Sequence, residues 1–198
     1  ILAGQGKVPA ADKSFNYHWG VPLTLARMPQ DADYAVIEIG MNHPGEIAPL
    51  AKLAQPDVAM VTIVASVHLE AFDDVAGIAR EKAAILEGLR PGGTAVLNAD
   101  IDTAPILFDA ARAKHARIVG FGFDDSADWR LLSAEVNGDK TIVHADADGV
   151  KLLFRLQSPG RHFAMNGLGA LASALACGAD LARAAGDLGR WMPFQGRG

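Results

Sequence analysis

The sequence predicts an α/β fold, with a mostly parallel sheet flanked by helices, an antiparallel β-meander and a C-terminal helix pair. Up to residue 122, apolar runs of β-forming residues alternate with helical segments, as in sheets whose parallel strands are joined by helices. Three strand-like runs then follow one another over 129–156 with only short turns between them. The Gly- and Ala-rich stretch over 159–191 has the composition and periodicity of two helices.

Periodicity, together with the prolines and glycines that punctuate it, places the individual elements. We expect, in order, a loop and short helix over 14–29, a buried strand over 33–40, a helix over 45–53, a strand over 56–64, a helix from 75, a strand over 92–100, a helix over 102–114 and a strand over 116–122. The meander strands are expected over 129–136, 140–145 and 150–156. Gly178 is placed to end the first C-terminal helix.

The composition is that of a globular protein, with 50% hydrophobic and 21% charged residues among 198. A net charge of −5 gives no basic patch, so we expect no nucleic-acid partner. No apolar run approaches the roughly 20 residues that span a bilayer, so we expect no membrane insertion. The single cysteine, Cys177, favours a reducing, cytoplasmic location. Because the chain starts without methionine and ends on a turn-like FQGRG, we expect a fragment of a longer protein.

Polar residues follow three of the predicted strands: Glu38 with Asn42 and His43, then the segment 66–68 with His68, then the segment 98–100. Ligands of parallel sheets gather beyond the carboxyl ends of the strands. A carboxylate and an imidazole after neighbouring strands suit a divalent cation such as Mg²⁺ or Mn²⁺. The alternative is a carboxylate at a strand tip that faces water and a histidine that caps a loop.

Lys82 lies on the apolar stripe of the helix that starts at Val75, whereas Arg80, Glu81 and Glu87 fall elsewhere on that helix. Two interpretations stay open. The aliphatic stem covers apolar surface while the ammonium group reaches water. Alternatively, the lysine faces the same cleft as His68, where a carbamate on its amine would supply oxygen ligands instead of a positive charge.

His162 and Asn166 are spaced i, i+4 near the start of a predicted helix, so their side chains share one face. They either bind a nucleotide base or ribose, or they only cap the helix and face solvent. Arg197 carries a fork of donors suited to a phosphate. We assign Asp73 and Asp74 to capping of the helix that follows them.

Several segments resemble the ATP-dependent Mur ligases of peptidoglycan synthesis. The carriers, in the order of that family, are SFNYHWGVPLTLARMP, VIEIGMNHPGEIAPLAKLAQPDVAMVT, VHLEAF with AREKAAI, LNAD, and GRHFAMN. The resemblance implies a P-loop NTPase-like central domain over 1–193 and the start of a hinge over 194–198. No GxxxxGK[ST] motif is present, and GQGK at 4–7 lacks its spacing, so the P-loop strand would lie upstream.

Within this family, GMNHPGEI favours the ligases that add D-alanyl-D-alanine to UDP-N-acetylmuramoyl tripeptide. The resemblance then implies a cytoplasmic monomer that uses ATP and Mg²⁺ and passes through an acyl phosphate. Two alternatives remain: a sister ligase, of the Mur or folylpolyglutamate type, that adds another amino acid by the same chemistry, and a non-catalytic α/β binding module.

The resemblance also implies residue roles. Glu38 and His68 correspond to Mg²⁺ ligands, and Lys82 to a carbamylated lysine that holds a second Mg²⁺. Nucleotide-side positions are Asn98, His162, Asn166 and Arg197, and substrate-side positions are Ser14, Asn16, Asn42 and His43. The sequence departs from the family pattern at Tyr17, where asparagine is expected, and at Asp73–Asp74, where a Gly-Ser-like pair is expected.

Overall fold

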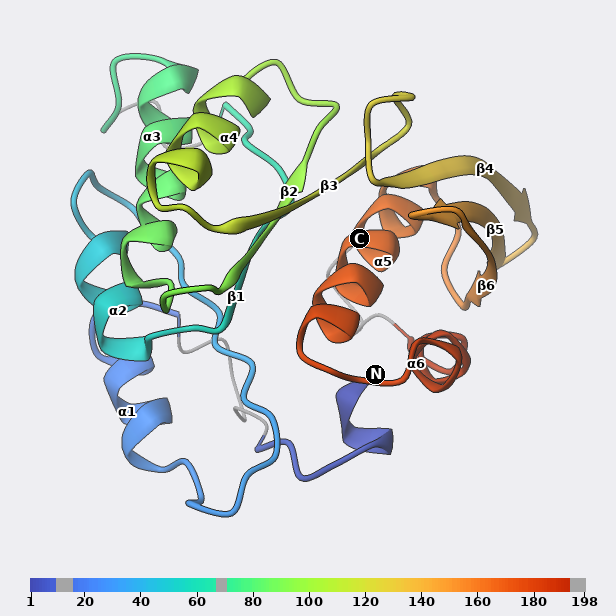
Figure 1. Cartoon of the computed structure of the whole chain (residues 1–198), viewed down its shortest axis with the longest axis horizontal. Helices are drawn as coiled ribbons and strands as arrows, with labels where there is room; N and C mark the ends of the chain where they lie inside the picture. The colour runs from blue at the N-terminus through green and yellow to red at the C-terminus, as the bar shows by residue number, and fades with distance from the viewer. Residues whose placement is uncertain (10–15, 67–70, 193–198) are drawn as a thin grey trace. The chain divides into compact units, whose positions relative to one another are not determined.

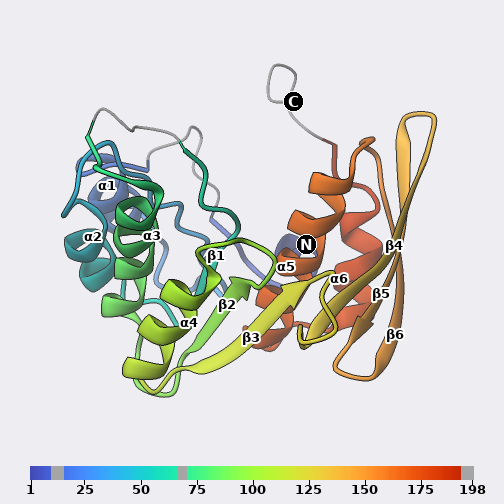
Figure 2. The same cartoon turned by 90° about the horizontal axis from the view of Figure 1, so that it is seen from above.

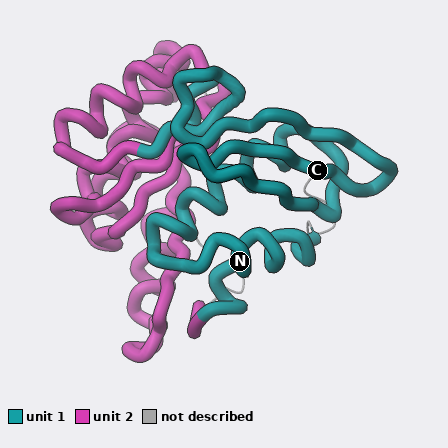
Figure 3. The backbone as a smooth tube through the Cα atoms, turned by 45° about the vertical axis from the view of Figure 1, so that its right-hand side comes forward, with its two compact units in different colours: residues 1–5, 98–100, 119–198 teal, residues 6–97, 101–118 magenta. Residues whose placement is uncertain are grey.

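The computed structural model describes residues 1–9, 16–66 and 71–192. The chain forms two compact units, coloured separately in Figure 3. We call residues 6–97 and 101–118 the N-terminal unit. Residues 1–5, 98–100 and 119–198 form the C-terminal unit.

The N-terminal unit is built on the parallel strands β1 (Val58–Val61) and β2 (Thr94–Asn98), which pair in register with Val58 opposite Thr94. Every residue of β2 is buried, as expected for a continuous apolar strand in a parallel sheet. Its helices are α1 (Gly20–Ala26), α2 (Ile47–Ala54), α3 (Val75–Ala83) and α4 (Ala104–Ala113), with the 3₁₀ segment η2 (Ala84–Gly88) after α3. Helices α2, α3 and α4 lie on one side of β1 and β2 (Figures 1 and 2).

The core of this unit joins the strands to those three helices. Ile47 from α2, Ile78 from α3 and Leu107 from α4 pack in one buried cluster with Ala59 of β1 and Leu97 of β2. The apolar stripe predicted for the helix from Val75 therefore has a physical basis, because Ile78 is completely buried. This packing fixes the position of α3, the helix that carries Lys82.

The C-terminal unit contains the end of β3 (Arg117–Gly122) and a three-stranded meander. Its other elements are η1 (Leu2–Gly4), β4 (Trp129–Asn137), β5 (Lys140–Ala147), β6 (Val150–Leu156), α5 (Arg161–Ala176) and α6 (Leu181–Leu188). Helix α5 packs on one face of the meander, with α6 beside β6 (Figure 2). A Cβ on Gly167 would lie 3.2 Å from the Phe154 ring and 3.3 Å from Leu188, so the small residue permits close packing of the helix.

The predicted fold class is confirmed. Within the described ranges, six strands are hydrogen-bonded in chain order, β1 to β6, in a mixed sheet with flanking helices. β1–β2 and β3–β4 are parallel, whereas β4–β5 and β5–β6 are antiparallel, as the meander pattern predicts. Gly178 ends α5 as expected: its φ of +83° lets its N–H donate to the Leu175 carbonyl and the Ala179 N–H to the Ala174 carbonyl.

The prediction of a strand over 33–40 is wrong, because this segment is extended but pairs with no strand among the described residues. The N–H groups of Asp33 and Tyr34 donate to the Lys7 carbonyl, and that of Gly40 donates to the Asn16 carbonyl, in place of a strand ladder. A run of β-forming residues becomes a strand only where a neighbouring strand supplies ladder partners. The predicted burial also fails for Val36, which is 62% exposed.

The helix predicted from residue 75 is present, but it changes character after Ala83. α3 ends there and continues as the 3₁₀ segment η2. Its start agrees with the capping assignment, since Asp74 is the N-cap and accepts a hydrogen bond from the Gly77 N–H at 2.6 Å. Among the described residues, no helix combines the length and apolar character needed to cross a membrane.

Candidate functional site

Glu38 lies in an extended segment without strand pairing, and its side chain is exposed. Its carboxylate accepts a hydrogen bond from the side-chain amide of Asn16 at 2.8 Å. The Asn16 carbonyl also accepts the Gly40 N–H at 2.8 Å, so one residue holds both the side chain and the backbone of this segment. A Cβ on Gly40 would lie 2.9 Å from the Asn16 amide nitrogen, so a larger residue there would displace the Asn16 side chain. Asn16 thus orients Glu38.

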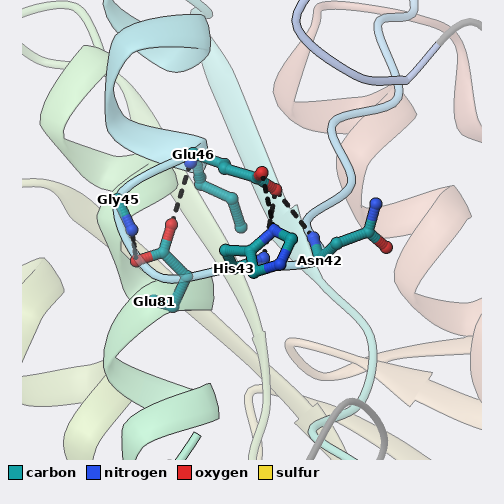
Figure 4. A network of polar contacts seen from close by, with 6 residues as sticks. Asn42, His43, Gly45, Glu46 and Glu81 are labelled. Carbon is teal, nitrogen blue, oxygen red and sulfur yellow. Dashed lines mark hydrogen bonds and ion pairs between the residues drawn. The ribbon is translucent and has the colours of Figure 1, made fainter. Parts of the chain in front are cut away.

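Asn42 and His43 lie in the short loop before α2, and two carboxylates hold that loop (Figure 4). One oxygen of Glu46 accepts the N–H groups of Asn42 at 2.7 Å and His43 at 3.2 Å. The Asn42 N–H, followed by the His43 contacts, lowers the pKa of the Glu46 carboxyl below its ordinary value. The second carboxylate belongs to Glu81 of α3, which accepts the Gly45 and Ile47 N–H groups.

Lys82 follows Glu81 on α3, and its side chain is partly buried. Burial lowers the pKa of the Lys82 ammonium group below its ordinary value, because desolvation disfavours the charged form. A neutral amine is the form that reacts with CO₂ to give a carbamate. The environment of Lys82 therefore suits the modification that the sequence suggests.

The nucleotide-side candidates of the C-terminal unit begin with Asn98, the buried last residue of β2. Its side-chain carbonyl accepts the Asp100 N–H at 2.9 Å. The Asp100 carboxylate in turn accepts the N–H groups of Phe123 at 2.7 Å and Asp124 at 3.2 Å. The LNAD segment thus fixes the turn that follows β3.

His162 and Asn166 both lie in the first turns of α5, and both side chains are exposed. The His162 ring lies 4.1 Å from the Phe163 ring, centroid to centroid, and Phe163 lies 5.8 Å from the Trp191 ring. This row of rings, with the exposed Asn166 amide on the same helix, has the composition of a surface that receives a planar base.

Three predicted site residues, Ser14, His68 and Arg197, lie outside the described residues. Within the described ranges, no group of three or more His, Cys, Asp or Glu side chains is arranged to hold a metal ion. Lys7 of the GQGK segment is ion-paired with Asp31.

Sequence reasoning missed Glu81 and did not assign Glu46. Both look like ordinary helix-surface charges in the sequence. Their partners are backbone N–H groups, which every residue except proline carries, so the residue types do not indicate these contacts. The one available signal is the position of Glu46 within GMNHPGEI, four residues after Asn42, where a carboxylate can turn back on its own loop.

The family model of the Mur ligase middle domain matches residues 2–174. The chain belongs to the Mur ligase middle domain family. Two relatives share the name UDP-N-acetylmuramoyl-tripeptide–D-alanyl-D-alanine ligase. That of Escherichia coli is 33% identical over 192 residues, covering 91% of this chain and 40% of the relative. That of Bacillus subtilis is 31% identical over 173 residues, covering 87% of this chain and 36% of the relative.

Solved Mur ligases have the same fold. A crystal structure of MurF from Acinetobacter baumannii matches with a TM-score of 0.92 at 28% identity, covering 99% of this chain and 42% of that one. MurF from Thermotoga maritima, crystallised in complex with ADP, matches with a TM-score of 0.83 at 24% identity and covers 100% of this chain and 45% of that one. This Mur ligase domain therefore spans less than half the length of the proteins it resembles.

Proposed function

We propose that this Mur ligase domain belongs to a MurF-type enzyme. The enzyme would join D-alanyl-D-alanine to UDP-N-acetylmuramoyl tripeptide in the cytoplasm, with cleavage of ATP to ADP and phosphate. The supporting observation is the agreement of relatives from distant bacteria, at 33% and 31% identity, on one ligase name. Residues 1–193 would form the central ATP-binding domain and residues 194–198 the start of a hinge, in a monomeric protein.

The reaction has two steps. The terminal carboxylate of the tripeptide attacks the γ-phosphorus of ATP, which forms an acyl phosphate and releases ADP. The amine of D-alanyl-D-alanine then attacks the acyl carbon, the tetrahedral intermediate collapses, and phosphate leaves as the amide forms. Both steps need the reacting groups to be aligned and water to be excluded.

The residues of the N-terminal unit suit the metal side of this reaction. Glu38, His68 and carbamylated Lys82 would hold Mg²⁺, which offsets the negative charge of the phosphates when it is bound. The orientation of Glu38 by Asn16 and the lowered pKa of Lys82 support this assignment. Asn16 would then act through Glu38 in addition to its proposed place near the substrate.

The remaining candidates would bind the two organic substrates. Asn98, His162, Asn166 and Arg197 would bind ATP, with the aromatic row of His162, Phe163 and Trp191 beside the base. Ser14, Asn42 and His43 would contact the UDP-muramoyl peptide. His43 suits this role because its side chain is 71% exposed while its backbone is held by Glu46.

The test is an ATP-dependent ligation assay on the full-length enzyme. D-Ala-D-Ala should be the preferred amine, with amide, ADP and phosphate formed in equal amounts. Preference for a single amino acid would assign the protein to a sister ligase instead. Absence of ligation with every amine would favour a binding module. The 198-residue chain alone should hydrolyse ATP negligibly, because it contains no P-loop motif.

A further inference from the structure

The loop before α2 is held by an unusual arrangement of carboxylates. Glu81 of α3 accepts two backbone hydrogen bonds from it, one from the Gly45 N–H at 2.8 Å and one from the Ile47 N–H at 2.9 Å, each to a different carboxylate oxygen. Gly45 has a φ of +84°, a backbone conformation that glycine adopts without strain. Figure 4 shows the Glu81 carboxylate at the Gly45 end of the loop and the Glu46 carboxylate at its Asn42–His43 end.

Glu81 takes the place of a local helix cap. Ile47 is the first residue of α2, and the N-cap residue Glu46 makes no capping hydrogen bond to the helix with its side chain. The first N–H groups of a helix need acceptors, and a carboxylate satisfies them with charge-assisted bonds that also match the helix dipole. Here the acceptor arrives from a helix 34 residues further along the chain.

This acceptor also joins two parts of the proposed site. Glu81 directly precedes Lys82, so the turn of α3 that carries Lys82 also holds the loop that carries Asn42 and His43. A shift of the loop would therefore change the position of the proposed peptide-binding side chains relative to Lys82.

We propose that Glu81 is a positioning residue, which locks the Asn42–His43 loop to the helix of the reactive lysine. This inference rests on the proposed ligase function. Glu81 touches no reacting atom in this scheme. It keeps the peptide-binding loop in a fixed position relative to Lys82. Its loss should therefore weaken peptide binding more than ATP binding.

The variant Glu81→Gln tests this directly in the full-length enzyme. A glutamine has one oxygen to accept an N–H and presents an NH₂ group to the other, so one of the two bonds is lost and a donor faces a donor. Glu87→Gln is the matched control, because Glu87 joins the same helical segment to α2 through Lys52 and leaves the loop untouched. Glu81→Asp keeps the charge but shortens the side chain.

Two measurements are made on each variant. Amide hydrogen exchange in peptides covering 42–47 should accelerate about tenfold in Glu81→Gln and stay unchanged in Glu87→Gln, as expected for loss of a charge-assisted bond. The KM for the UDP-muramoyl peptide should rise about tenfold in Glu81→Gln, with the KM for ATP within about twofold of wild type. Glu81→Asp should recover part of both changes.

Each result decides a different point. If exchange over 42–47 responds equally in both glutamine variants, Glu81 does not hold the loop and the proposal fails. If exchange accelerates but the KM for the peptide stays at the wild-type value, Glu81 only caps α2 and the positioning role is overturned. If wild-type enzyme joins no D-Ala-D-Ala at all, the ligase function itself falls and the positioning role with it, even where the exchange result stands.

Discussion

Replacing Gly88 by alanine should destabilise the N-terminal unit more than any other glycine-to-alanine change in it. Gly88 is the last residue of η2 and packs against the backbone of α2. A Cβ added there would lie 2.0 Å from the Ala51 carbonyl oxygen, 2.1 Å from the Ala51 carbonyl carbon and 2.6 Å from the Lys52 nitrogen. All three are backbone atoms of a helix, so none can rotate away as a flexible side chain would.

The size of the effect follows from that overlap. Ordinary contact begins at 3.4 Å, so α2 and η2 would have to separate by about 1.4 Å. Overpacking of this kind typically costs about 1–3 kcal/mol and more where the neighbour is backbone, so we expect about 3 kcal/mol. For a domain of this size that corresponds to a fall in Tm of roughly 6–12 °C.

The assay is urea and thermal unfolding of Gly88→Ala beside Gly186→Ala. Gly186 lies in α6, is exposed, and would have no neighbouring atom within 4 Å of an added Cβ. The same substitution there should stabilise the protein by about 0.5–1 kcal/mol, because alanine favours the helix. A loss of less than about 1 kcal/mol in Gly88→Ala would refute the backbone-contact argument.

Four other substitutions test the site and its support. Asp74→Ala should cost about 1 kcal/mol of stability through the lost N-cap, while Asp73→Ala stays near wild type, and equal effects in urea unfolding would contradict the capping assignment. Lys82→Ala should lower ligase activity strongly, with partial rescue by a short carboxylic acid. Wild-type activity in this variant would mean that the lysine stem only covers apolar surface. Burial lowers the pKa of Lys82, so the buried ammonium group reduces the free energy of unfolding. This loss of stability is complete below the pKa of the folded state and disappears as the pH rises to the pKa of the unfolded state. In protein kept free of CO₂, where Lys82 is not carbamylated, Lys82→Met should therefore be more stable than wild type near pH 7, with the difference shrinking towards about pH 10. A difference that grows with pH would have the wrong sign. Asn16→Ala should reduce activity about tenfold or more by releasing Glu38, with unfolding unchanged; an unaffected Mg²⁺ dependence would argue against orientation through Glu38.

Local sequence signals predicted most of the fold because the elements here obey them. Gly178 ends α5 by a positive φ, and Asp74 starts α3 by a side-chain bond to a residue three positions away, so both rules act within one turn. The strand expected over 33–40 failed for the opposite reason. Its residues favour a strand, but a strand also needs a partner, and sequence composition does not say whether one is adjacent.

The same distinction separates the parts of the site that sequence predicts from those it cannot. Glu38 and Lys82 stand out because a charge within an apolar run or stripe breaks a pattern. Glu81 breaks no pattern, and Asn16 is expected on the substrate side but not as the partner of Glu38. Their contacts span 34–36 and 22 residues, respectively. The orienting role of such residues can be recognised only in the folded structure, where they lie beside their partners.

The hydrogen bonds of the loop also limit how it can recognise a substrate. The N-terminus of a helix attracts anions, so the start of α2 would be a natural place for a phosphate or carboxylate. Here the N–H groups of Asn42, His43, Gly45 and Ile47 already donate to Glu46 and Glu81. A second anion at this point would lack those donors and would face two negative charges. Any recognition by this loop must therefore come from side chains, and both the Asn42 amide and the His43 imidazole are exposed there. A His43→Ala variant should accordingly weaken peptide binding even though the N–H groups of Asn42, His43, Gly45 and Ile47 keep their partners. Unchanged peptide binding would mean that the His43 side chain does not make the contact.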